Sequence, residues 1–437
     1  MSRFVDYFVI CGYDHTKGRT GNPKESHSQV IQRFPERDWP DIPFIHGLDL
    51  FCQPHGWLLT PDRQEPKFFV SILTDAEGNR LYCPCLTFSE AIAKDKLGMV
   101  SVDEDAEDDG GHHVASGPLS LVTVRGSTLP RHVVPGVSLP TSQDDGVMFA
   151  PKCLALVSKH DMTETFRNCL GLIYTVYTER MAGPGGEPVR LETLVGNLLS
   201  LVSVPGPGAP PVKFSLGAND RQILASSSHP EVPATGARVA LLFQQLGIRA
   251  VLTLFSAVLT EQKILLHSAS YSRLTDSATA LTSLIYPMRY SHTLVPVLPH
   301  SILEVLSSPT PFIIGVHSIN QDHIADLLDV IVVDLDGGII HIPENMKLQR
   351  VMEPLESQVV YELSLVLHPE LAMADNAFQT PSSRQSGKSP EMLDKELRAV
   401  MLRLMTQLLQ VNDGKINTKR RGKSLSDHSR QTVFSHR

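Results

Sequence analysis

Two short triplets in the sequence end like a phosphate-binding loop. Residues 387–389 and 422–424, both Gly-Lys-Ser, supply the lysine and the hydroxyl that hold phosphate and Mg²⁺ in nucleotide-binding loops. Such a loop also needs a glycine five residues before the triplet, but Ser382 and Asn417 occupy those positions. Neither triplet follows an expected strand. We therefore interpret both as Ser- and Lys-rich loops without nucleotide chemistry.

The cysteines invite a metal or redox interpretation at one point only. Cys83 and Cys85 are separated by a single proline in an expected strand, and no second closely spaced pair completes a tetrahedral metal site. Free cysteines often pack as small hydrophobic side chains, which is the reading we adopt. The sequence thus predicts no metal and no cofactor. Six cysteines scattered over a long chain fit a reducing compartment, with the cytoplasm as the default location.

Other catalytic arrangements are missing from the sequence. The 18 histidines are dispersed, with no H-E-x-x-H pattern, and no G-x-S-x-G motif presents a serine nucleophile. Asp334 and Asp336 flank Gly-rich residues and fit a turn better than an acid/base pair. We therefore predict no catalytic residue and no bond-making enzyme.

Apolar and aromatic residues in two connections are better candidates for a binding surface. Residues 286–290 (YPMRY) link an expected helix to a strand, and residues 309–314 (PTPFII) lead into another strand. Loops at strand ends are common binding sites in open α/β sheets, and Tyr and Arg are enriched at interface hot spots. The alternative is that Tyr286 and Phe312 belong to the core while Arg289 caps a carbonyl.

The bulk properties narrow the class of protein that positions these loops. The 437 residues carry 39 Lys and Arg against 47 Asp and Glu, a formal net charge of −8, which gives no indication of nucleic-acid binding. An apolar content of 42% is ordinary for globular domains. The richest apolar stretch, 239–266, is interrupted by Glu261 and Lys263, so we expect no membrane span.

The N-terminal part predicts a small α+β unit over residues 1–98. An aromatic and β-branched run at 6–13 favours a first strand, and two β-rich runs at 67–74 and 80–88 flank a turn of Asp, Glu, Gly and Asn. Residues 99–147 then lose all periodicity behind an acidic cluster, which predicts a disordered linker.

The remainder predicts an α/β unit followed by helices. Strand and helix patterns alternate through residues 148–340, which is typical of a mostly parallel sheet covered by helices. Residues 341–411 predict a helical segment: 353–368 are helical by period, 379–390 form a Ser-, Gln- and Pro-rich loop, and 392–409 are strongly amphipathic. Residues 412–437 are basic and poor in apolar side chains, so we expect a disordered tail. Such a tail suits peripheral contact with an anionic membrane, or simple solvation.

Six stretches, in this order, resemble the tripartite DENN module, and in particular the N-terminal part of the SET-binding factors, the large myotubularin-related pseudophosphatases. They lie in the upstream and core segments of that module, and the amphipathic stretch 392–409 resembles the start of its downstream segment. They are RFPERDWPDIPFIHGLDLFCQPHGW (33–57), FRNCLGLIY (166–174), VLTEQKILLHSASYSRLTDS (258–277), LIYPMRYSHTLVPVLP (284–299), SSPTPFIIGV (307–316) and DVIVVDLDGG (329–338).

The resemblance implies a longin-like upstream lobe over 1–98, a core α/β lobe over 148–340 and a partial downstream segment over 341–411. It also implies guanine-nucleotide exchange on a Rab-family GTPase without a nucleophile or cofactor, in the cytoplasm with recruitment to endosomal membranes. The GTPase-binding candidates are Tyr286, Arg289, Tyr290, Thr310 and Phe312. The alternative function is a non-catalytic binding module or scaffold in endosomal traffic, with exchange lost through an incomplete downstream segment.

Because the SET-binding factors are pseudophosphatases, phosphatase activity has to be considered for this sequence as well. The phosphate loop of such enzymes requires an arginine six residues after the nucleophilic cysteine. Lys17, Ser89 and Lys159 stand at that position after Cys11, Cys83 and Cys153. We therefore predict no phosphatase activity.

Overall fold

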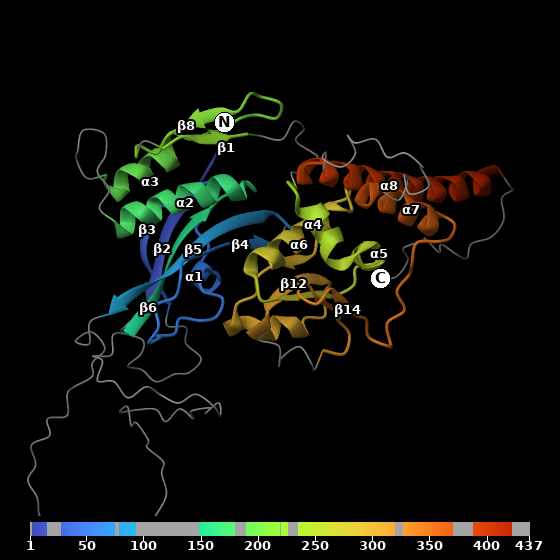
Figure 1. The fold of residues 1–437 in the computed structure, drawn as a ribbon, viewed down its shortest axis with the longest axis horizontal. Helices are drawn as coiled ribbons and strands as arrows, with labels where there is room; N and C mark the ends of the chain where they lie inside the picture. Colours follow the sequence, from blue (N-terminus) through green and yellow to red (C-terminus); the bar gives the residue numbers. More distant parts are fainter. Residues whose placement is uncertain are drawn as a thin grey trace, which may run out of the picture.

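The computed structural model is an α/β fold built on two five-stranded sheets that lie side by side (Figure 1). The expected acidic linker, 99–147, lies outside the described residues, as do the triplet 422–424 and Gly387 of the triplet 387–389. The structure describes residues 2–14, 28–74, 78–92, 148–179, 189–218, 220–225, 235–319, 327–369 and 388–421, with side chains to residue 410.

The first sheet is antiparallel and has the strand order β3-β2-β6-β5-β4. Helices α2 and α3 cover one face, and the short helix α1 covers the other (Figure 1). Because both faces are covered, β2 is buried at nearly every position, without the alternation of a half-exposed strand. The elements are β2 (Tyr7–Tyr13), β3 (Ser28–Phe34), α1 (Leu48–Cys52), β4 (Lys67–Thr74), β5 (Arg80–Ile92), β6 (Met148–Val157), α2 (Thr163–Thr178) and α3 (Leu191–Ser200).

Short strands complete this first lobe. β1 (Ser2–Arg3) pairs with β7 (Ser203–Val204), and β8 (Val212–Phe214) pairs with β9 (Gln222–Leu224). The sequence segments and the lobes do not coincide. β6, α2 and α3 belong to the expected core segment, yet they fold with the N-terminal strands, because β6 pairs with β2 on one side and β5 on the other. The first lobe therefore consists of residues 2–92 and 148–225.

The second sheet has the order β11-β12-β10-β13-β14, with the first four strands parallel and β14 antiparallel at the edge. Helices α4 to α8 pack on one face, and the 3₁₀ segment η3 packs on the other. The elements are α4 (Arg238–Leu246), α5 (Ile248–Leu259), β10 (Ile264–Ser268), α6 (Tyr271–Ser283), β11 (Thr293–Val295), η3 (His300–Ser307), β12 (Phe312–His317), β13 (Ile331–Asp334), β14 (Ile339–His341), α7 (Leu355–Leu367) and α8 (Pro390–Arg421).

The α/β class and the parallel sheet agree with the sequence interpretation, whereas the tail differs. Residues 412–421, expected to be disordered, continue α8 to Arg421, and residues 422–437 lie outside the described part of the chain. Lys and Arg are good helix formers, so a low apolar content does not stop a helix that is already nucleated. The long amphipathic helix is therefore extended rather than cut at residue 411.

α8 is fixed to the second lobe by one buried carboxylate. Asp394 is fully buried and its Oδ1 accepts hydrogen bonds from the amides of Val239 (2.8 Å) and Ala240 (3.2 Å) at the start of α4. Its Oδ2 accepts from Thr235 Oγ1 (2.5 Å) and Arg398 Nε (2.9 Å). Amides at a helix N-terminus lack partners within the helix, so Asp394 acts as a cap supplied from a distant helix.

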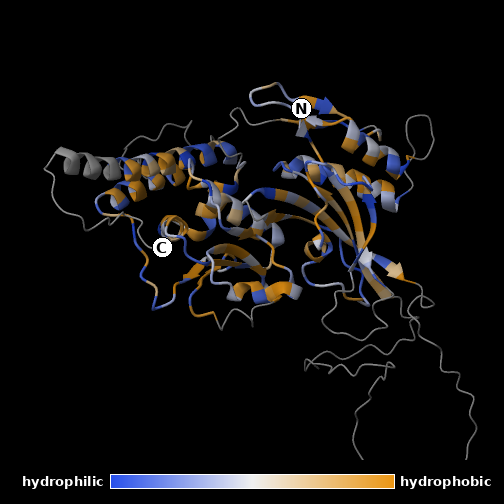
Figure 2. Cartoon of the chain, turned by 180° about the vertical axis from the view of Figure 1, so that it is seen from behind, coloured by the Kyte–Doolittle hydropathy of each residue, from blue (hydrophilic) through white to orange (hydrophobic). Residues whose placement is uncertain are grey.

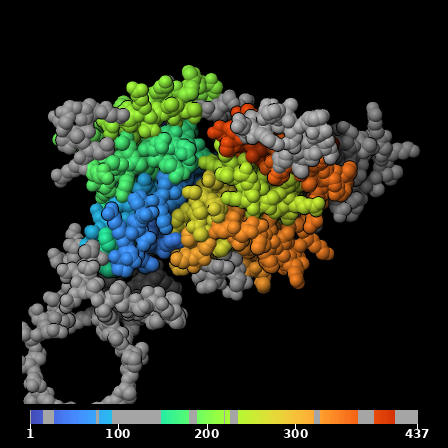
Figure 3. All heavy atoms as spheres, in the orientation of Figure 1, coloured from blue at the N-terminus to red at the C-terminus, as the bar shows by residue number. Residues whose placement is uncertain are grey.

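The two lobes share a core where β4 packs on α6 and β11. Ile72 of β4 is 2% exposed and lies among the apolar residues of the second lobe. Two hydroxyls tie the edge: Thr275 Oγ1 donates to the Val70 carbonyl (2.7 Å), and Thr74 Oγ1 donates to the Leu294 carbonyl (2.9 Å). Figure 3 shows the first lobe, blue and green, against the yellow-to-red second lobe without a gap on this face.

Apolar residues gather on the strands between the helical layers, as Figure 2 shows. No single helix among the described residues is long and apolar enough to cross a bilayer. The pair α4 and α5 reaches that length and apolarity only when taken together, and it is bent by 115° at the break. Gly247 forms this break, with a φ of 79° that suits glycine.

Candidate functional site

Both loops singled out in the sequence lie at the amino edge of the second sheet. Residues 286–292 connect α6 to the start of β11, and residues 308–311 precede β12. Thr293 lies opposite Phe312 in the parallel pairing of these strands, so the two loops are neighbours. The strand-end rule that favoured them concerns carboxyl ends. The loops therefore lie at the opposite edge from the one that the rule describes.

Burial divides the predicted binding residues into two groups. Arg289 and Thr310 are exposed and Tyr286 is half-buried, so these three can contact a partner. Tyr290 and Phe312 are only 6% and 1% exposed, and both belong to the core. They cannot be surface anchors. For Phe312 the alternative reading holds, because the apolar run of β12 is buried on both faces.

A hairpin of the first lobe borders the same edge. Arg80 Nη2, at the start of β5, donates a hydrogen bond to the Tyr290 carbonyl at 3.3 Å. A Cβ placed on Gly78 would lie 3.6 Å from the Ser291 carbonyl oxygen, so the turn before β5 contacts this loop. We call residues 78–80, 286–292 and 308–311 the amino-edge surface. The sequence predicted the hairpin but gave no indication of its neighbour.

The exposed groups on the amino-edge surface combine apolar and cationic character. Met288 is 43% exposed beside Arg289, and Arg289 makes no hydrogen bond or ion pair with any described residue. His292 Nε2 lies 3.2 Å from Glu261 Oε1 on the neighbouring turn. An exposed arginine next to an exposed apolar side chain is a common composition of protein-binding hot spots. These exposed side chains make this edge a candidate protein-binding surface.

The carboxyl edge of the same sheet is braced by its own side chains. Asp336 accepts hydrogen bonds from Ser268 Oγ (2.7 Å), from the Ala269 amide (2.6 Å) and from Arg273. Partial burial acts against the ionised carboxylate, but these three donors lower its pKa. His317 Nε2 is within 2.9 Å of the Ala269 carbonyl. The polar groups at this edge are occupied by one another.

A turn of the first lobe closes that carboxyl edge. The ring of His55 lies 4.3 Å from the ring of His317 and 5.2 Å from that of Tyr271. The His300 amide donates to the Pro54 carbonyl at 2.8 Å. Burial, followed by repulsion from His317, lowers the pKa of His55 to about 4. The cluster is thus an uncharged contact between the lobes.

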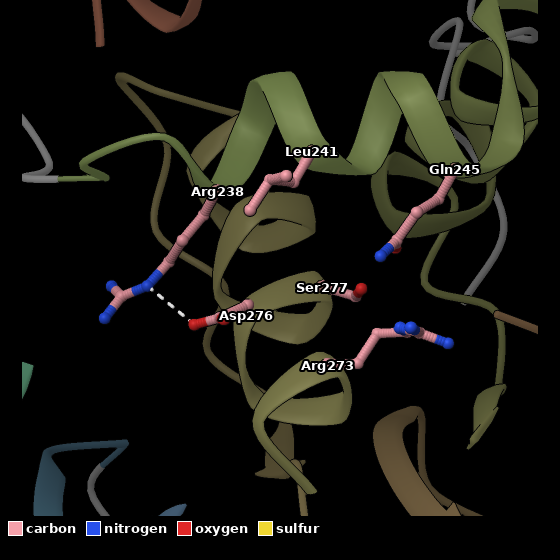
Figure 4. Close-up of a pocket in the computed structure, with 6 residues that line it drawn as sticks. All are labelled: Arg238, Leu241, Gln245, Arg273, Asp276 and Ser277. Atoms are coloured by element: carbon pink, nitrogen blue, oxygen red, sulfur yellow. Dashed lines mark hydrogen bonds and ion pairs between the residues drawn. The ribbon is translucent and has the colours of Figure 1, made fainter. Parts of the chain in front are cut away.

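A small pocket between α4 and α6 is lined in part by the ion pair of Arg238 and Asp276 (Figure 4). Arg238 Nε bonds Asp276 at 3.0 Å, while its Nη1 reaches Asp161 of the first lobe at 2.5 Å. Burial raises the pKa of Asp276 despite the neighbouring guanidinium. The cavity measures about 160 Å³, below the roughly 300 Å³ at which ligand sites begin. Arg238 therefore ties the lobes together.

Comparison with protein families matches both lobes. Residues 28–88 match the uDENN domain, and residues 149–338 match the DENN (AEX-3) domain. The DENN match starts in β6, so it includes strands and helices of the first lobe as well as the whole parallel sheet.

A curated relative matches along almost the whole chain. It is the DENN domain and WD repeat-containing protein SCD1 of Arabidopsis thaliana, 24% identical over 433 residues. The match covers 94% of this chain but only 32% of the relative, so the chain spans about a third of that protein's length. The α/β architecture, the ordered sequence stretches and these matches lead to one conclusion: the chain contains a uDENN domain and a DENN domain.

Proposed function

We propose that this chain is a guanine-nucleotide exchange factor for a Rab-family GTPase. DENN domains generally serve as Rab exchange modules and typically bind Rab GTPases. The observation that carries the proposal is the composite amino-edge surface, where residues 78–80 of the first lobe border residues 286–292 of the second. A surface formed by both lobes can contact a protein of GTPase size through residues of each lobe.

Exchange by such a surface requires no nucleophile and no cofactor. The GTPase holds its nucleotide through switch loops that contact phosphate and Mg²⁺, and a factor that displaces those loops releases the nucleotide. Coupling between the two binding events is reciprocal. A factor that binds best to the empty GTPase therefore weakens nucleotide binding, and incoming GTP releases the factor.

Within this proposal Arg289 is the main anchor. Its exposed guanidinium has no partner among the described residues, so binding would not first break an existing ion pair. Met288 adds apolar contact, while Tyr286 and Thr310 border the anchor from the two loops. Residues 78–80 supply the contact from the first lobe.

The test is release of a fluorescent guanine nucleotide from a panel of Rab GTPases, with the full chain at micromolar concentration. We expect acceleration for one or a few Rabs, and a loss of at least about 30-fold for Arg289→Glu, the effect of removing a hot-spot residue. Arg249→Glu is the matched control. Arg249 is exposed at the start of α5, roughly 16 Å along the helix from Thr260, which precedes the Glu261 that contacts His292 of the amino-edge surface.

Two results would count against the proposal. One is that no Rab in the panel is accelerated, and the other is that Arg249→Glu loses as much activity as Arg289→Glu. A non-catalytic scaffold is the second candidate function. It would capture a GTP-loaded Rab in a pulldown and ignore the nucleotide-free form.

The narrower resemblance to the SET-binding factors and the recruitment to endosomal membranes stay part of this proposal. Five Lys or Arg residues between positions 415 and 423 would contribute about 1 kcal/mol each near an anionic surface. Sedimentation with phosphatidylserine vesicles, compared with the same vesicles at high salt, measures this contact.

A further inference from the structure

Five of the six cysteines converge on one buried face of the first sheet. They come from sequence positions up to 142 residues apart, yet they all lie in the core between the sheet and α1. This core also holds Leu48 and Trp57, which cover the thiols from the other side. The five are Cys11, Cys52, Cys83, Cys85 and Cys153.

Strand pairing explains why the thiols meet. Cys11 of β2 lies directly opposite Cys153 of β6, and Cys85 of β5 pairs with Ala155, two positions further along β6. Residues two apart on a strand share a face, so all three side chains point to the same side of the sheet. Cys52, the last residue of α1, packs over them.

Three of these sulfurs have the spacing of a metal site. The Sγ atoms of Cys52, Cys85 and Cys153 all lie within 4.8 Å of one another. Three sulfurs around one ion at about 2.3 Å would be about 4 Å apart, so a contraction of less than about 1 Å closes the site. The Cys11 thiol contacts Cys52 and lies beside this group.

The surroundings select the kind of ion. All three cysteines are 0% exposed, and the neighbouring core residues are apolar, so water does not reach the sulfurs. Thiolate ligands select copper(I) and zinc over hard cations, and structural zinc sites are almost always four-coordinate.

We propose that Cys52, Cys85 and Cys153 form a three-coordinate binding site for a thiophilic d10 cation, with copper(I) as the ion that fits three sulfurs without water. Binding displaces thiol protons, so affinity increases with pH. The ion would cross-link α1 to β5 and β6, and would therefore stabilise the first lobe.

The test is titration of the reduced full chain with copper(I) against the chromophoric chelator bicinchoninate. We expect one ion per chain, and binding at least about tenfold weaker in Cys85→Ala and Cys153→Ala. Cys83→Ala is the matched control, because Cys83 is buried in the same core, two residues before Cys85, but is not one of the three. Equal binding by the Cys85→Ala and Cys83→Ala variants would overturn the proposal.

Two further measurements complete the test. One distinguishes zinc(II) from copper(I), and the other uses the unaltered chain, so that it does not depend on the folding of a variant. Tight zinc(II) binding that Cys11→Ala abolishes would replace the three-sulfur copper site with a four-sulfur zinc site; we expect Cys11→Ala to retain copper(I). In the unaltered chain, copper(I) should slow alkylation of three of the six thiols and raise the unfolding midpoint. Unchanged alkylation and an unchanged midpoint would contradict the proposal without any substitution.

Discussion

The two edges of the parallel sheet carry similar polar residues and use them in different ways. At the carboxyl edge, Asp336 is held by three donors and His317 lies against the turn of the first lobe. At the amino edge, Arg289 is exposed and without a partner among the described residues. The edge where open α/β sheets usually bind ligands is thus used to join the lobes. In our proposal, the partner binds at the opposite edge.

The largest loss of stability is expected in the middle of β12, which runs from the amino edge of the sheet to its carboxyl edge. Gly315 lies in the middle of β12, and a Cβ there would come within 1.8 Å of the Pro296 carbonyl oxygen. Gly315→Ala must push β12 from its neighbour, so we expect the free energy of unfolding to fall by about 3 kcal/mol. Urea unfolding followed by circular dichroism measures it. Gly171→Ala, where a Cβ meets nothing within 4 Å, should cause no loss.

The second-largest effect is a difference in stability loss between substitutions at the carboxyl edge and at the amino edge of the sheet. Asp336→Ala leaves the Ala269 amide and Ser268 without their acceptor, and we expect a loss of about 1.5 kcal/mol of unfolding free energy. Asp329→Ala at the amino edge removes an exposed ion pair with Lys263 and should cost less than about 0.5 kcal/mol.

Nucleotide release per folded molecule should be unchanged in the Asp336→Ala variant. If Asp329→Ala destabilises the chain as much as Asp336→Ala, the two edges are braced alike and the comparison fails. If Asp336→Ala abolishes exchange while the chain stays folded, the binding surface lies at the carboxyl edge instead.

The smallest effect is a pH dependence that the histidines at the carboxyl edge contribute to. The folded-state pKa of His55, about 4, lies below its ordinary value of 6.5, so the unfolded chain binds more protons between these values. Stability should therefore be full above about pH 7 and decrease as the pH falls from 6.5 towards 4. His317 and His160 have lowered pKa values, mainly through burial, and add to the same trend. Lys67 and His300 are the other groups whose charge acts on the pKa of His55.

Unfolding midpoints in urea at pH 7 and pH 5 measure this dependence. The difference should shrink in His55→Gln and persist in His341→Gln, which alters an exposed histidine of β14. An undiminished difference in His55→Gln would show that the junction between the lobes does not titrate.

Local patterns predicted the elements well because they depend on neighbours in sequence. The expected hairpin of 67–74 and 80–88 matches β4 and β5, and the break at Gly247 separates α4 from α5. Helix α6 begins at Tyr271, where Ser270 caps it by accepting a hydrogen bond from the Arg273 amide, as expected for a serine at that position.

What could not be predicted depends on pairing between distant segments. The apolar run of β6 gave no indication that it would enter the first sheet, and the spacing of Cys52, Cys85 and Cys153 is not a sequence motif. The burial of Tyr290 and Phe312 likewise depends on helices packed over them. Of the candidate site, the sequence located the two loops, and the fold decided which of their side chains reach the surface.

The cap that Asp394 places on α4 also orders events during synthesis. The carboxylate lies 155 residues after the Val239 amide that it satisfies. At ribosomal rates of about 5–20 residues per second, the start of α4 waits about 10–30 s for its acceptor. During that interval the second lobe has two open amides and no α8 over its apolar face. The apolar face of the nascent second lobe therefore stays uncovered until its last helix leaves the ribosome.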